Sequence, residues 1–125
     1  MSTRLVNVTR GQTIAASIEL AITPRQRMKG LLGRKGLDAG SGLVIDPCTS
    51  IHMFFMKFPI DVLFVDSGGT VVRAIEHLKP WRLTRFYPSA RWCAELPIGA
   101  LAQSGTREGD AVKLETISPD GASAR

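Results

Sequence analysis

A chain of 125 residues has room for one ordinary domain, and 44% hydrophobic with 22% charged residues is a globular composition. The 16 basic and 11 acidic residues give a net charge of +5, which favours anionic partners only where the charges cluster. No segment reaches the ~18 apolar residues that a transmembrane helix needs. The N-terminal segment also lacks the continuous apolar run of a signal peptide. These features exclude a disordered or membrane-spanning chain, and we expect a soluble cytoplasmic protein with no membrane partner.

The N-terminal third predicts two strands and one helix. Alternating apolar residues favour strands over 4–9 and 15–22. Thr23 and Gln26 have the spacing of a capping box, and Pro24 suits the first helical position because it needs no amide donor. A helix is therefore predicted over 24–32, followed by a glycine-rich connection that lacks the frame of a phosphate-binding loop.

The middle of the chain predicts buried strands. A short strand over 43–45 is followed by two segments, 50–57 and 60–65, that are apolar at nearly every position. Apolar runs without alternation are typical of strands covered on both faces. Turn residues at 66–69 then lead into a predicted strand over 70–75, so the two flanking strands are expected to form a hairpin.

The C-terminal part predicts a surface loop over 79–88, a strand over 90–96, a short helix over 97–104 and a last strand over 111–116. Residues 1–116 are thus predicted to form a single domain, and 117–125 a loose tail. The expected fold class is mainly β (α+β): a compact small barrel, or a curled antiparallel or mixed sheet, with two short helices.

Four sequence motifs carry a family resemblance. The run from Ser50 to Asp66, SIHMFFMKFPIDVLFVD, resembles the signature of the prokaryotic family called domain of unknown function 192. Segment 27–34 resembles its R-x-x-G-L-M-x-R motif, with Leu32 in place of methionine, and 95–99 resembles its E-L-P-A-G turn, with Ile98 in place of a small residue. Segment 105–112 resembles the closing G-x-x-x-G-D-x-V motif.

The order and spacing of these motifs agree over about residues 12–116. The resemblance implies a small, largely β domain, which in this family occurs alone or behind a secretion signal. It brings no established biochemical activity with it. Because this chain shows no leader-like segment, export is not expected here.

Asp61 is the most informative single residue, because it interrupts an otherwise apolar strand and an isolated buried carboxylate is costly to ionise. One interpretation is structural: the carboxylate bonds backbone amides at the bend over 58–60. The other is functional, with the carboxylate in an apolar pocket. Glu95 is a second carboxylate in apolar company, and Arg27 is a candidate counter-ion. The predicted ligand-binding residues are Arg27, His52, Lys57, Asp61 and Glu95, and the catalytic candidates are Asp61, Glu95 and His52.

Three functions remain open. The first is a non-catalytic accessory module that binds a small ligand or a protein near residues 50–61. The second is a small enzyme that uses Asp61 and Glu95 for acid–base chemistry. The third is weak nucleic-acid binding through the basic and aromatic stretch 81–91, although no nucleic-acid-binding motif accompanies it and nucleic acid is not the expected partner.

The remaining chemistry-bearing residues suggest no further site. His52 and His77 lack metal-ligand spacing, so no metal and no cofactor are expected. Cys48 and Cys93 lie far apart in the sequence, and each is expected to be a reduced, small buried hydrophobe. The phenylalanines and methionines of 53–58 are expected to belong to the core.

Overall fold

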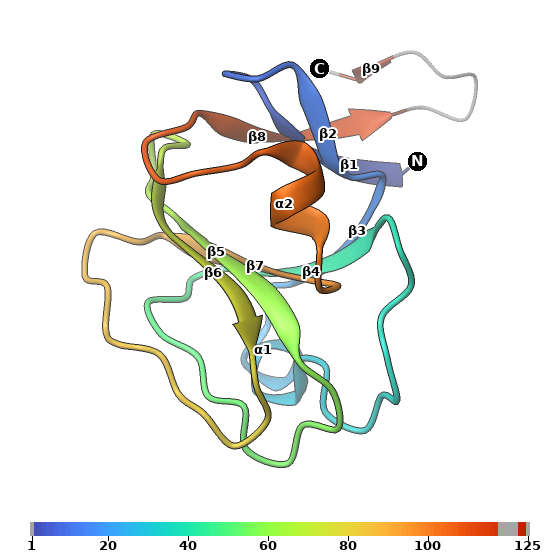
Figure 1. Ribbon diagram of the computed structural model, residues 1–125, viewed down its shortest axis with the longest axis vertical. Coiled ribbons are helices and arrows are strands. Elements are labelled where there is room, and N and C mark those ends of the chain that lie inside the picture. The colour runs from blue at the N-terminus through green and yellow to red at the C-terminus, as the bar shows by residue number, and fades with distance from the viewer. Residues whose placement is uncertain (1, 118–122, 125) are drawn as a thin grey trace.

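The strands form two sheets, which Figure 1 shows in a computed structural model that describes residues 2–117 and 123–124. The first sheet has the order β2-β1-β8-β9 and consists of β1 (Ser2–Asn7), β2 (Gln12–Ala15), β8 (Val112–Ile117) and β9 (Ser123–Ala124). The second has the order β3-β4-β7-β5-β6 and consists of β3 (Ser17–Ala21), β4 (Ser41–Ile45), β5 (Ile60–Val65), β6 (Val71–Leu78) and β7 (Trp92–Leu96). Among the described strands, only β3 and β4 pair in parallel. Two short helices, α1 (Pro24–Lys29) and α2 (Ala100–Ser104), complete the elements.

The mainly β fold with two short helices is confirmed, and the five-stranded sheet is mixed. The barrel alternative is wrong, because neither sheet closes on itself within the described residues. One reason why no barrel forms is that the chain passes from one sheet to the other at Ala16. The single strand predicted over 15–22 is divided there, since β2 ends at Ala15 in one sheet and β3 begins at Ser17 in the other.

The five-stranded sheet is covered on both faces. On one face, residues such as Leu63 and Leu96 pack with α2 and the first sheet; on the other, Val62 and Phe64 belong to a second cluster. All six residues of β5 are buried, as the continuous apolar run predicts. The predicted hairpin is also confirmed, because β5 pairs antiparallel with β6. In Figure 1, α2 lies between the two sheets and α1 lies beyond the five-stranded one.

Segment 50–57, predicted as a buried strand, forms a loop instead. Met53 and Met56 are buried, whereas Phe55 between them is exposed. The spacing of three comes from a turn in which the Met56 amide donates to the Met53 carbonyl at 3.2 Å. The buried methionines and their exposed aromatic neighbours together form a sequence as apolar as that of a buried strand. Hydrophobicity alone therefore does not distinguish this loop from a strand.

Both helices are shorter than predicted. The capping box of α1 is present: the Gln26 amide donates to Thr23 Oγ1 at 3.2 Å, and Gln26 Oε1 accepts from the Thr23 amide. The helix ends at Gly30, whose φ of 48° lets the chain turn back toward the sheet. Helix α2 follows Gly99, which has no side chain of its own with which to cap the helix.

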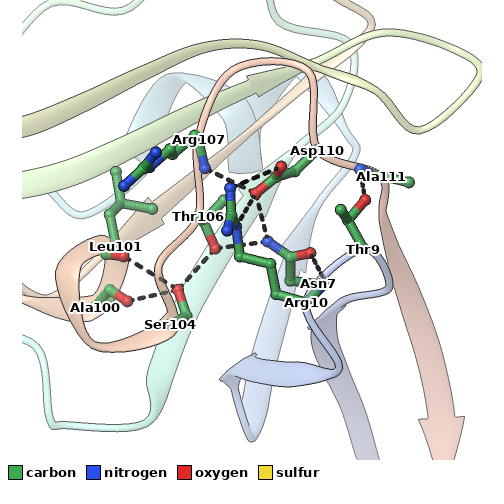
Figure 2. A network of polar contacts seen from close by, with 10 residues as sticks. All are labelled: Asn7, Thr9, Arg10, Ala100, Leu101, Ser104, Thr106, Arg107, Asp110 and Ala111. Carbon is green, nitrogen blue, oxygen red and sulfur yellow. Dashed lines mark hydrogen bonds and ion pairs between the residues drawn. The ribbon is translucent and has the colours of Figure 1, made fainter.

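A buried polar network ties the β1–β2 turn to the segment that follows α2 (Figure 2). Asp110 accepts hydrogen bonds from Asn7 Nδ2 at 3.0 Å and from Arg10 Nε at 2.7 Å. The Asn7 amide also donates to Thr106 Oγ1 at 3.0 Å. Hydrogen bonding to Arg10 and then to Asn7 lowers the pKa of Asp110 to about 2. The network therefore holds an ionised carboxylate against a buried amide.

The predicted tail over 117–125 lies mostly outside the described residues. Ile117 is the last residue of β8, and Ser123–Ala124 form β9, which pairs with β8. The division into a domain over 1–116 and a loose tail stays a prediction. Among the described residues, no helix is long and apolar enough to cross a membrane.

Candidate ligand-binding pocket

A pocket of about 530 Å³ opens between α1 and the segment that follows β4. We call it the α1 pocket, and its chemically distinctive lining residues are Arg27, Cys48, His52, Met56 and Glu95. Helix α1 supplies the first of these, the loop after β4 supplies the next three, and β7 supplies the last. Leu31 and Ile45 contribute apolar surface. The pocket thus combines apolar walls with several polar groups, which also include Lys29, Thr49 and Ser50.

Glu95 lies in the α1 pocket with only 6% of its surface exposed. Its carboxyl group makes no hydrogen bond and no ion pair with any described residue. Burial raises its pKa to about 7, and the nearby positive charge of Arg34 only partly opposes this. Near neutral pH the side chain is therefore present in both protonation states, and it can donate or accept a hydrogen bond.

Arg27 is the second polar group of the pocket without a partner. Its Nε–H is buried and finds no acceptor among the described residues. A buried donor without an acceptor is rare, because it loses its hydrogen bonds to water and gains nothing in return. Arg27 forms no ion pair with Glu95, although both line the same pocket. An acceptor from outside the chain would satisfy this donor.

Two thiols, which the sequence did not assign to a site, lie beside these groups. Cys48 lines the pocket and packs against the core cluster that contains the fully buried Cys93. Hydrogen bonding with Cys93 lowers the pKa of Cys48, against the opposing effect of burial. The same contact, together with burial, raises the pKa of Cys93 well above its usual range. The sequence gives no signal for this pairing, because it depends on β4 and β7 being neighbours in the sheet.

Asp61 is fully buried and lies outside this pocket. Its Oδ1 accepts from the His77 amide at 3.0 Å, and its Oδ2 accepts from the amides of Gly99 and Leu101, each at 3.1 Å. The carboxylate therefore joins β5 to the end of β6 and to the start of α2. It bonds backbone amides, as the structural interpretation expects, but at these elements and not at the bend over 58–60.

The two predicted carboxylates lie on opposite faces of the five-stranded sheet. In the antiparallel pairing of β5 with β7, Asp61 lies opposite Leu96, and Val62 lies opposite Glu95. Paired residues share a face, and successive residues alternate. Leu96 belongs to the core cluster on the α2 side and Val62 to the other. The fold thus does not bring Asp61 and Glu95 together.

Of the five predicted ligand-binding residues, the fold gathers three: Arg27, His52 and Glu95 line the α1 pocket. Lys57 is exposed and, like Asp61, is not part of that lining. His52 accepts a hydrogen bond from the Phe54 amide at its Nδ1, at 3.3 Å. Within 2–117 and 123–124, no group of three or more His, Cys, Asp or Glu residues is placed to hold a metal ion.

Comparisons with known proteins agree with this architecture. Two curated relatives are named UPF0127 protein: one from Thermococcus sibiricus is 30% identical over 89% of this chain and 74% of its own, and one from Thermococcus gammatolerans is 33% identical over the same shares. A solved structure from Sinorhizobium meliloti, provisionally named as a transcription regulator, is 28% identical with a TM-score of 0.74 over 89% of this chain and 90% of its own. A protein of unknown function from Novosphingobium aromaticivorans, 21% identical with a TM-score of 0.77 over 90% of this chain and 84% of its own, shares the fold.

A family model also matches most of the chain. The model is that of DUF192, described as "Uncharacterized ACR, COG1430", and it matches residues 5–114. That range contains the four motifs of the sequence and every residue named in the α1 pocket. The chain therefore belongs to the family of domain of unknown function 192, an uncharacterised family.

Proposed function

We propose that this protein is a non-catalytic binding module that holds a small molecule in the α1 pocket. One observation carries the proposal: the buried Nε–H of Arg27 finds no acceptor among the described residues, and it lies in the same open pocket as Glu95, whose carboxyl group makes no hydrogen bond with them. Leaving the Arg27 donor unsatisfied costs stability, and burial of the Glu95 carboxyl group disfavours its charged form. A ligand that satisfies both offsets that cost on binding.

The two groups define the chemistry of the ligand. Arg27 supplies a charged donor, which suits a carboxylate or another anionic acceptor. Glu95 suits a hydroxyl or amine placed beside that acceptor, because the carboxyl group can accept in one protonation state and donate in the other. The apolar walls suit an aliphatic body. A small hydroxy acid or amino acid with an aliphatic side chain combines these features.

The alternative of an enzyme based on Asp61 and Glu95 receives no support from this geometry. The two carboxylates lie on opposite faces of a sheet, and all the bonds that Asp61 accepts come from backbone amides. A general acid–base pair must reach one reacting group, which these two residues cannot do.

A fragment screen by protein-observed NMR tests the proposal. We expect aliphatic hydroxy acids and amino acids to shift resonances of α1, Cys48 and Glu95, and their uncharged amides to do so more weakly. Arg27→Gln should lower the affinity for the best acid about 10- to 100-fold, as expected for a lost charge-assisted hydrogen bond. Arg25→Gln, on the same helix but outside the pocket lining, is the matched control. The proposal would be contradicted if Arg27→Gln left the affinity for these acids unchanged. It would also be contradicted if the resonance shifts were confined to another part of the molecule.

A further inference from the structure

Two loops, 49–58 and 79–88, lie side by side below the five-stranded sheet in Figure 1. The Met53 amide donates to the Arg82 carbonyl at 2.7 Å, and the Trp81 amide donates to the Met53 carbonyl at 2.8 Å. His52 and Leu83 form an isolated antiparallel bridge between the same loops. These contacts fix the two loops against each other, so their tips form one surface.

That surface exposes large apolar side chains. The exposed fractions are 70% for Phe55, 59% for Trp81, 65% for Leu83 and 66% for Phe86. The rings of Phe55 and Trp81 pack edge to face with centroids 4.8 Å apart. Single exposed apolar residues are common, but several on adjoining loops are typical of an interaction site.

The backbone holds two of these rings outward at a cost. Phe55 has a φ of 64° and Trp81 a φ of 68°, a left-handed conformation that bulky residues rarely adopt. Such strain persists only where the surrounding structure imposes it, and it is concentrated at functional sites. The hydrogen bonds between the loops impose it here. The apolar tips are thus held in place before any partner arrives.

The charge of the surface is of one sign. Segments 47–60 and 77–94 contain no aspartate and no glutamate. Lys57, Lys79, Arg82 and Arg85 are exposed, and among the described residues they form no ion pair. We call these four cations and the four exposed apolar residues the aromatic–basic surface. A second copy of this surface would be repelled, and an anionic partner would be attracted.

We propose that the aromatic–basic surface binds the anionic face of a phospholipid bilayer, with its apolar tips at the depth of the headgroups. Tryptophan with lysine and arginine is the composition of interfacial contacts. The expected absence of a membrane partner rests on the length of apolar segments, which concerns only spanning. Single-stranded nucleic acid fits the same surface less well than a bilayer, because its bases stack on exposed aromatic rings. Leu83 has no ring, and the rings of Trp81 and Phe55 cover part of each other.

Vesicle sedimentation tests the proposal, with an equimolar mixture of phosphatidylglycerol and phosphatidylcholine compared with phosphatidylcholine alone. We expect binding to the anionic vesicles that falls as salt is added. Arg82→Gln with Arg85→Gln should lower the partition coefficient about thirtyfold, since each cation near an anionic surface contributes roughly fivefold. Trp81→Ser should lower it at least about tenfold.

The matched control is Arg107→Gln with Lys35→Gln, which removes the same charge from exposed positions outside the two loops that form no ion pair with the described residues. It should leave the binding nearly unchanged, and thermal melts of every variant show that each is folded. No binding, equal binding to neutral vesicles, or an equal effect of the control pair would overturn the proposal. The proposal would also be overturned if the protein bound a single-stranded oligothymidine more tightly than anionic vesicles, and if the Trp81 and arginine variants abolished that binding. This result would assign the surface to nucleic acid.

Discussion

Replacement of Asp61 by asparagine separates a structural carboxylate from a functional one. Asp61 accepts three backbone amides through two oxygens. Asparagine has one oxygen and one NH₂ group. If its oxygen keeps the amides of Gly99 and Leu101, its NH₂ faces the amide of His77, so that two donors meet at a fully buried position.

The size of the effect follows from these contacts. A hydrogen bond to a charged acceptor contributes about 1.5–3 kcal/mol, and a buried donor without an acceptor costs about 1–3 kcal/mol. Asp61→Asn should therefore lower the free energy of unfolding by about 2–3 kcal/mol, and Asp61→Ala, which leaves all three donors unpaired, by about 4–6 kcal/mol. A domain of this size has a total of about 5–15 kcal/mol, so the alanine variant should be close to unfolding.

Urea denaturation followed by circular dichroism measures both changes. Amide hydrogen exchange should also become faster at Gly99 and Leu101 in Asp61→Asn, because the start of α2 loses its anchor. Asp66→Asn is the matched control, since Asp66 accepts the amides of Gly68 and Thr70 in an exposed turn and should cost less than about 1 kcal/mol. The structural assignment would be refuted if Asp61→Asn kept the stability of the parent protein and lost ligand binding.

Three further predictions follow from the pKa values and the network. The pKa of Glu95 is raised in the folded state to about 7, so its contribution to stability should be greatest below its ordinary pKa of 4.5 and should fall by about 3 kcal/mol as the pH rises to 8. Glu95→Gln should therefore remove the loss of stability between pH 5 and 8 in denaturation experiments. An unchanged profile would contradict the burial of its neutral form. Iodoacetamide should modify Cys48 and spare Cys93 in the folded protein, as read by peptide mass spectrometry; equal labelling would show that the thiol contact is wrong. Asp110→Ala should lower the free energy of unfolding by about 2–4 kcal/mol in urea melts, because one buried N–H of the Asn7 side chain and the Arg10 guanidinium lose their acceptor. A loss below about 0.5 kcal/mol would show that the network is dispensable.

The sequence predicted the features that depend on local chemistry. The capping box at Thr23 and Gln26 requires only neighbouring residues, and it is present. The six-residue run of β5 could be assigned because a strand covered on both faces of a sheet buries every side chain. Segment 50–57 could not be assigned in this way, since its burial repeats every third residue through a turn held by a backbone hydrogen bond.

The site depends on which strands are neighbours, and that information is not local. Arg27, His52 and Glu95 were predicted as companions, and the α1 pocket unites them. Asp61 was grouped with them because it too is a carboxylate in apolar sequence. The register of β5 against β7 decides on which face of the sheet Asp61 lies. Because Val62 is paired with Glu95 and shares its face, Asp61, the preceding residue, points to the opposite face. Cys48 was missed because the approach of its loop to β7 has no signature in the spacing of the cysteines.

The two carboxylates show why burial alone does not identify a binding site. Asp61 and Glu95 are both buried and both lie in apolar strands. Asp61 is satisfied from within the chain, by amides that the fold must hold in place whatever the protein binds. Glu95 accepts no hydrogen bond from the described residues, and it lies in the pocket where the Nε–H of Arg27 also finds no acceptor among them. A fold under selection for stability alone would pair these two side chains with each other or replace them with apolar residues, because a buried donor without an acceptor and a desolvated carboxyl group both cost free energy. Their separation within one open pocket is thus the strongest argument that something from outside the chain completes it.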